Sequence, residues 1–150
     1  MRHPARQGAA RLVQSSSGQN LAEFAIVSVL LILLVIGIAE FARAWNVYQI
    51  ITNAAREGAR LAALPAGFTT DAEVNARVTD YLASGNLDQT QATITIGRAG
   101  VDGATGTQVS VAVSYPYQFT FLGPVIRLVD STATAGSDIT IQSEVVMRNE

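Results

Sequence analysis

The sequence predicts an α+β fold: one long N-terminal helix, with a transmembrane half and an amphipathic half, packed on a small antiparallel sheet. Three observations predict it. Residues 24–39 carry no charge, residues 40–64 place apolar side chains at helical spacing, and beyond Gly85 apolar residues recur at every second position. The 150 residues are 49% apolar and only 15% charged, against roughly 25% charged in an average soluble domain. This composition excludes a wholly disordered chain.

Residues 1–18 precede the apolar run with a basic and then small, polar composition. Arg2, Arg6 and Arg11 have no acidic residue among them, whereas from Gln19 onward the chain has seven arginines and twelve acidic residues. No apolar periodicity runs through this segment. It is therefore either a positively charged leader or a plain N-terminal tail.

Residues 21–39 are apolar on every side, over a length close to the ~20 residues that cross a bilayer. The positive-inside rule places the arginine-rich N-terminus in the cytoplasm and the remainder of the chain outside. Phe41, Trp45 and Tyr48 follow at once. They form either an interfacial aromatic belt or the apolar stripe of a helix that continues.

The spacing of apolar residues predicts that the helix runs on to Leu64, where Pro65 ends it. Its apolar face shrinks toward this end to Ala55, Gly58, Ala59 and Ala62. Small side chains let another element approach closely. They indicate packing of the helix on the sheet of the same chain, with a contact between subunits as the alternative.

The rest of the chain predicts a short helix and then strands. Thr70 and Glu73 have the spacing of a capping box, and Gly85 ends the helix that they begin. Period-two alternation predicts strands over 93–96, 109–115 and 139–147, with a turn at Asp102-Gly103. The segment Phe119, Phe121 and Leu122, ahead of Gly123-Pro124, is either a short fourth strand or a buried loop.

The residue inventory excludes most kinds of enzyme and metal site. The chain has no cysteine and no lysine, and its only histidine is His3. Glycines recur every third residue from Gly97 to Gly106, without the motif or the following helix of a phosphate site, so a flexible hairpin loop is expected. Asp71, Glu73 and Asp80 lack EF-hand spacing. We expect no catalytic residue, no metal, no cofactor, no small-molecule substrate and no nucleic-acid partner.

The most informative site lies where the leader meets the helix. Gly18 is followed by four residues and then by Glu23-Phe24, at the head of the apolar run. Glu23 either complements the helix dipole, worth ~0.3–1 kcal/mol, or meets a cation in a stack of apolar helices. If the chain is cut after Gly18, the free amine of Gln19 on a neighbouring subunit supplies that cation.

These residues resemble the class III signal of type IV pilins, which a prepilin peptidase cuts after the glycine. The stretch 18–60 is similar to the TadE-like minor pilins of tight-adherence (Tad, or Flp) pilus systems. The shared residues fall in order along it: Gly18, Glu23, Phe24, Gly37, Glu40, Phe41, and the run Asn53-Ala54-Ala55-Arg56-Glu57-Gly58-Ala59-Arg60. The YPYQF segment and the terminal VVMRNE also resemble that family. One departure is Gln19, since many type IV pilins begin the mature chain with phenylalanine.

The resemblance implies a non-enzymatic, pilin-like protein of the bacterial inner membrane that is needed for pilus assembly. Its implied partners are prepilin peptidase, other pilins, platform proteins of the pilus machinery and membrane lipid. Processing is assigned to Gly18 and Gln19, and assembly to Glu23 and Phe24. Asn53, Arg56, Glu57, Gly58 and Arg60 make either a specific contact or a plain solvated face.

We expect three segments: a cleavable leader (1–18), the transmembrane half of the helix (19–40) and an extracytoplasmic α+β domain (41–150). Two alternatives stay open. An ordinary secretory signal, cut at Gly37-Ile38-Ala39 or Ala42-Arg43-Ala44, would release a binding domain or adhesin. An uncut helix would instead anchor such a domain permanently.

Overall fold

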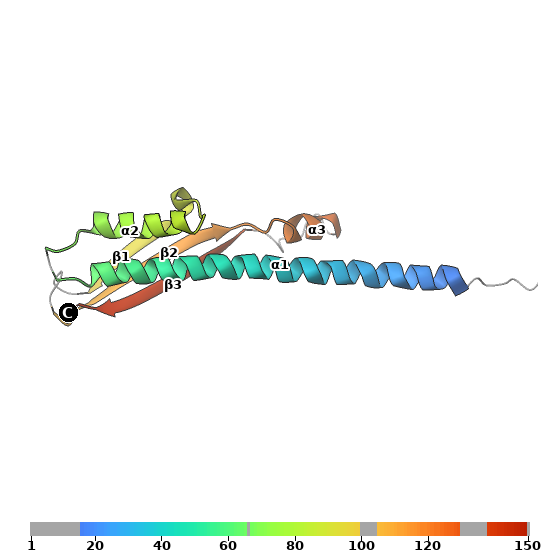
Figure 1. Ribbon diagram of the computed structural model, residues 1–150, viewed down its shortest axis with the longest axis horizontal. Helices are drawn as coiled ribbons and strands as arrows, with labels where there is room; N and C mark the ends of the chain where they lie inside the picture. Colours follow the sequence, from blue (N-terminus) through green and yellow to red (C-terminus); the bar gives the residue numbers. More distant parts are fainter. Residues whose placement is uncertain (1–15, 66, 100–104, 130–137, 150) are drawn as a thin grey trace, which may run out of the picture. The chain divides into compact units, whose positions relative to one another are not determined.

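A computed structural model describes residues 16–65, 67–99, 105–129 and 138–149. Its elements follow in the order α1, α2, a 3-10 turn η1, β1, β2, α3 and β3 (Figure 1). The chain divides into two compact units, Met1–Val35 and Ile36–Glu150. The long helix α1 contributes to both, and the second unit contains every other element.

Helix α1 spans Ser16–Ala62, 47 residues. It ends two residues before the predicted end at Leu64, because Pro65 disfavours helical geometry at the residue before it. The last turn tightens there, with the Leu64 amide donating to the Leu61 carbonyl at 3.3 Å. At the other end α1 begins three residues before Gln19, inside the predicted leader. Nothing in Ser16-Ser17-Gly18 prevents a helix, and serine is favoured where helices begin.

Helix α2 spans Asp71–Ser84 and has the predicted capping box. The Glu73 amide donates to the Thr70 hydroxyl at 3.3 Å, and the Thr70 amide donates to the Glu73 carboxylate at 2.7 Å. Gly85 follows the helix, as predicted, and η1 covers Gln89–Gln91. The apolar side of α2 is buried: Val74, Val78 and Leu82.

The three predicted strands form one antiparallel sheet in the order β1-β2-β3: β1 Thr93–Ala99, β2 Gln108–Tyr117 and β3 Ile139–Arg148. Alternate residues of β2 are buried, from Val109 to Tyr117, and their partners across the ladders share that face. Ser143, which interrupts the apolar alternation of β3, pairs with Val113 and is buried with it. The other face of the sheet is mainly polar, with Ser110, Ser114 and Glu144 among its residues, and also carries Val146.

The core lies between the buried face of the sheet, the C-terminal part of α1 and helix α2. Within the second unit, α2 and this part of α1 run beside each other along the sheet (Figure 1). Ala55, Ala59 and Ala62 are fully or almost fully buried in this core. The small residues at the end of α1 therefore pack inside the chain.

The segment after β2 is a loop over residues 118–121, one of the two predicted structures, but it continues as a helix that was not predicted. Phe121 is 55% exposed, and α3 spans Leu122–Val129. Only Phe119 packs inward, edge-on to Tyr117 at 5.3 Å between ring centres. Pro124 explains the difference, because proline is tolerated in the first turn of a helix but interrupts the ladder of a sheet. The predicted turn at Asp102-Gly103 lies outside the described residues.

Candidate functional site

The residues predicted to act in processing and assembly lie in the first turns of α1. Gly18, Gln19, Glu23 and Phe24 are all exposed. The side-chain amide of Gln19 donates to the Glu23 carboxylate at 3.0 Å, one helical turn away. Phe24, 71% exposed, begins a band of outward apolar side chains that extends to Ile38. Within its own chain, then, the Glu23 carboxylate is bonded to a neutral group.

Among the described residues, α1 alone is long and apolar enough to cross a membrane. The most apolar window of this helix has a mean hydropathy of 2.8 and buries none of its residues inside the protein. A core helix of a soluble protein would be mostly covered. The segment therefore suits membrane anchoring, as its composition predicts.

A buried carboxylate, Glu40, follows the apolar run and ties α1 to the far end of β2. The side chain is 1% exposed. One oxygen accepts a hydrogen bond from the Phe121 amide at 2.8 Å, and the other accepts one from the Tyr117 hydroxyl at 3.0 Å. Arg43, one turn along α1, approaches the same carboxylate at 3.3 Å. Each oxygen thus has a partner, as burial of a carboxylate requires.

The partners of Glu40 reinforce one another. Arg43 also donates to the Thr120 hydroxyl at 2.7 Å, and its guanidinium lies 5.8 Å from the centre of the Tyr117 ring. Burial and then the hydrogen bond to Glu40 raise the pKa of Tyr117, so its hydroxyl stays protonated and can donate. We call Glu40, Arg43, Tyr117, Thr120 and Phe121 the Glu40 cluster.

Sequence reasoning did not find this cluster. In the sequence, Glu40 is noticed only because it ends the apolar run and belongs to the residues shared with the family. Tyr117 is noticed only because it belongs to the YPYQF segment. The signal available was a lone carboxylate beside the apolar run with an arginine three residues on. Its other partners lie 77 and 81 residues away in sequence, so spacing alone could not connect them.

Replacing Glu40 by alanine is expected to destabilise the second unit by about 2–3 kcal/mol, since the buried Tyr117 hydroxyl and the half-buried Phe121 amide lose their acceptor. Glutamine keeps a carbonyl oxygen and should lose less. Thermal unfolding of the full chain in detergent, followed by circular dichroism, measures both. The matched control Glu144→Ala removes an exposed carboxylate from the open face of the sheet and should leave the midpoint nearly unchanged. Equal midpoints for Glu40→Ala and the wild type would contradict the structural role of Glu40.

The run from Asn53 to Arg60 divides into residues with different surroundings. Glu57 accepts hydrogen bonds from Arg60 at 2.8 Å and from Arg77 of α2 at 2.9 Å, so it joins the two helices. Gly58 is buried where α1 meets α2 and β2. Asn53 is half-buried and Arg56 is exposed. Within this chain, Glu57 and Gly58 lie where α1 meets α2, Arg60 pairs with Glu57 on α1 itself, and Arg56 is exposed.

The Glu57 pair makes stability depend on pH. Hydrogen bonds from Arg60 and then from Arg77 lower the pKa of Glu57 to about 2 from an ordinary 4.5. A carboxylate with a lowered pKa stabilises the fold above pH 4.5, and this contribution is lost as the pH falls through 2. Because both arginines are more than half exposed, the effect is about 1 kcal/mol.

We expect Glu57→Gln to lower the unfolding free energy at pH 7 by that amount and to match the wild type near pH 2. Urea titrations at a series of pH values in a nonionic detergent check this. A constant difference between the two proteins from pH 7 to pH 2 would show that Glu57 acts through packing and not through its charge.

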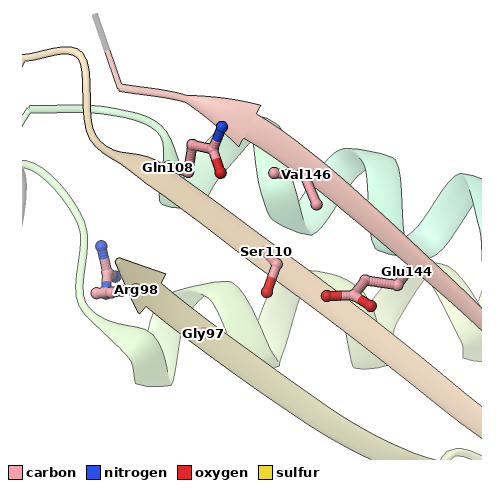
Figure 2. Close-up of a pocket in the computed structure, with 6 residues that line it drawn as sticks. All are labelled: Gly97, Arg98, Gln108, Ser110, Glu144 and Val146. Atoms are coloured by element: carbon pink, nitrogen blue, oxygen red, sulfur yellow. The ribbon is translucent and has the colours of Figure 1, made fainter. Parts of the chain in front are cut away.

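The open face of the sheet holds a shallow depression of about 310 Å³ beside Gly97 (Figure 2). Gly97, Ser110 and Glu144 come from three adjacent strands, and Arg98 and Gln108 lie toward the ends of β1 and β2. A Cβ at Gly97 would lie 2.7 Å from the Ser110 hydroxyl oxygen, so glycine creates the depression. Arg98 itself is engaged elsewhere, with Asp71 and with the Ala62 carbonyl at 3.3 Å.

Among the described residues, no three histidine, cysteine or acidic side chains come together in a way that could hold a metal ion. Of the carboxylates that pair with arginine among the described residues, Glu40 and Glu57 are the least exposed, at 1% and 21%. Such groups serve to stabilise the fold.

The N-terminal segment is similar to a known family. Residues 18–60 match the model of a family described as TadE-like protein. Comparison with curated proteins and with solved structures gives no match. The matched segment begins at Gly18 and ends at Arg60, so it includes the apolar band, Glu40 and the run from Asn53. Residues 18–60 are thus similar to the TadE-like family, the family named by the resemblance.

Proposed function

We propose that this protein is a minor pilin of a Tad-type adhesive pilus, made as a prepilin and cut by a prepilin peptidase between Gly18 and Gln19. The observation that carries the proposal is the family match that begins at Gly18 and continues along one uninterrupted, outwardly apolar helix. The role is structural and not enzymatic. Its partners are the peptidase, other pilins and the platform proteins of the assembly machinery.

The proposed orientation places the N-terminus in the cytoplasm and the sheet outside the inner membrane. The arginines of the leader support it through the positive-inside rule. Before assembly, the apolar half of α1 holds the subunit in the bilayer. In the assembled pilus, the same half packs against the apolar helices of neighbouring pilins.

The structure gives a reason to disfavour an ordinary secretory signal. Cleavage after Ala39 would turn the buried Glu40 into a charged chain terminus, and cleavage after Ala44 would remove Glu40 altogether. Either cut would disrupt the hydrogen bonds to Tyr117 and Phe121. A signal peptide is normally separable from the domain that it exports.

The intact mass of the protein purified from its host membranes tests the proposal. A chain that begins at Gln19 supports it. A chain that begins at Glu40 or Trp45 contradicts it and indicates a secretory signal, and a chain that keeps Met1 indicates a permanent anchor.

Processing is also expected to require Gly18. A bulky side chain at the residue before the cut would have to enter the peptidase pocket, so Gly18→Trp should leave the leader attached. The matched control Gly8→Trp makes the same change ten residues upstream and should be processed normally. Immunoblots of membranes distinguish the two lengths. Normal processing of Gly18→Trp would contradict a prepilin signal.

A further inference from the structure

The second unit has an apolar groove that the proposed function does not use. It has a volume of about 430 Å³, and all of its lining residues belong to that unit. One wall is a stripe of α1 that follows the apolar run, and the other comes from β3 and the segment after β2. The main lining residues are Phe41, Trp45, Tyr48, Phe119, Ile139 and Ile141.

The uncharged part of the apolar segment is by itself shorter than the hydrocarbon core of a bilayer. The sixteen uncharged residues from Phe24 to Ala39 cover about 24 Å at 1.5 Å per residue, whereas the hydrocarbon core is about 30 Å thick. Continuing to Trp45 gives 22 residues and about 33 Å. This extension contains two charged residues, Glu40 and Arg43, and charged side chains are normally excluded from the hydrocarbon core.

On the side of α1 that faces the groove, the Glu40 cluster keeps both charges away from the apolar surface. Among the residues that the structure describes, Glu40 is the only charged one that lines the groove, and its oxygens are bonded to Tyr117, Phe121 and Arg43. Arg43 does not line the groove but a separate hollow beside Tyr115 and Tyr117. The stripe Gly37, Phe41, Ala44, Trp45 and Tyr48 is therefore an uncharged continuation of the apolar surface.

We propose that this groove holds acyl chains of membrane lipid, so that the sheet end next to the Glu40 cluster is seated in the membrane surface. Three features favour lipid. The uncharged stretch is shorter than the hydrocarbon core, the Glu40 carboxylate is hydrogen-bonded inside the protein, and aromatic side chains lie along the edge of the groove. Phe41 and Trp45 are 69% and 53% exposed, and Trp45 and Tyr48 are the residue types that settle at the boundary between hydrocarbon and water. The proposal requires α1 to cross a membrane but does not require the chain to be cut or assembled.

Trp45 is the only tryptophan of the chain, so its fluorescence reports on the groove. The full chain is reconstituted in phosphatidylcholine vesicles, with lipids brominated on the upper acyl carbons or with acrylamide in the water as quenchers. Brominated lipid should quench most of the Trp45 emission, and acrylamide little of it. In the control Trp45→Phe/Phe68→Trp, the tryptophan lies in the exposed loop after α1 and should respond in the opposite way.

Two matched variants test the groove itself. Ile139 and Val146 lie on β3, are 44% and 55% exposed, and face opposite sides of the sheet. Ile139→Glu puts a charge into the groove and should remove most of the quenching by brominated lipid, whereas Val146→Glu should leave it unchanged. Equal unfolding midpoints show that both variants fold.

Two results would overturn the proposal. Quenching by brominated lipid that persists in Ile139→Glu would show Trp45 at the membrane surface with no lipid in the groove. Shielding of Trp45 from both quenchers that grows with the ratio of protein to lipid would show that a second copy of the chain covers the groove. The intact-mass experiment on processing is independent of either result.

Discussion

Gly58→Leu is expected to destabilise the second unit by about 3 kcal/mol, a large part of the stability of a small domain. A Cβ at this position would lie 2.5 Å from a methyl group of Val78 and 3.3 Å from one of Val111. Neither valine can turn away easily, because β-branched side chains have few rotamers and both residues are fully buried. The helices would have to separate, which would also pull Glu57 away from Arg77.

Gly37 offers a matched control on the same helix. A Cβ there meets nothing within 4 Å. Alanine in place of glycine normally stabilises a helix by about 1 kcal/mol. Gly37→Ala should therefore be neutral or stabilising, while Gly58→Ala should already destabilise. Thermal unfolding in detergent, followed by near-ultraviolet circular dichroism, measures the pair. Equal midpoints for the two alanine variants would contradict the close approach of α1 to α2.

Glu23→Ala is expected to abolish pilus assembly while processing after Gly18 continues. In the proposed assembly, the carboxylate meets the amine of Gln19 on a neighbouring subunit among apolar helices. Loss of one partner of such a buried pair costs about 3–5 kcal/mol, against at most ~1 kcal/mol if Glu23 only complements the helix dipole. The variant should accumulate in the membrane in its processed form. Pilus counts beside a membrane immunoblot measure both effects.

Glu23→Gln separates charge from hydrogen bonding at this position. Glutamine keeps the size of the side chain and can still accept the hydrogen bond that Gln19 donates at 3.0 Å. If an ion pair is what assembly needs, this variant should fail as completely as Glu23→Ala. Normal piliation of Glu23→Gln would assign Glu23 to the contact with Gln19 in its own chain.

Local patterns predicted most of the fold because they report what each segment does by itself. The Thr70–Glu73 capping box, the end of α1 before Pro65 and the alternation of β2 each depend on neighbours within a few residues. For the segment after β2, the predicted loop is present at residues 118–121, but the helix that follows it was not predicted. Apolar residues at 119, 121 and 122 suggested a buried structure, but Pro124 fits a first helical turn better than a strand.

The functional surroundings were harder to predict because they depend on contacts between distant segments. The bonds from Tyr117 to Glu40 and from Arg77 to Glu57 join residues 77 and 20 positions apart. The sequence separation of the two residues in each pair gives no sign that they are bonded. The resemblance singled out residues 53–60 and left open whether they make a specific contact or a solvated face. The sequence alone could not separate Glu57 and Gly58, which contact α2, from the exposed Arg56.

The start of α1 at Ser16 bears on how a peptidase could reach the proposed cut. Gly18 and Gln19 lie within the first turn of the helix, whereas a peptide bond must normally be unwound to enter a protease. The first four amides of a helix lack partners inside it, and glycine disfavours the helix by about 1 kcal/mol relative to alanine. Fraying there costs little, while the same bond deeper in α1 would be protected. The rate of cleavage would then depend on how often the first turn of α1 unwinds. Substitutions at residues 16–18 that stabilise the helix would slow cleavage even where the new side chain fits the enzyme.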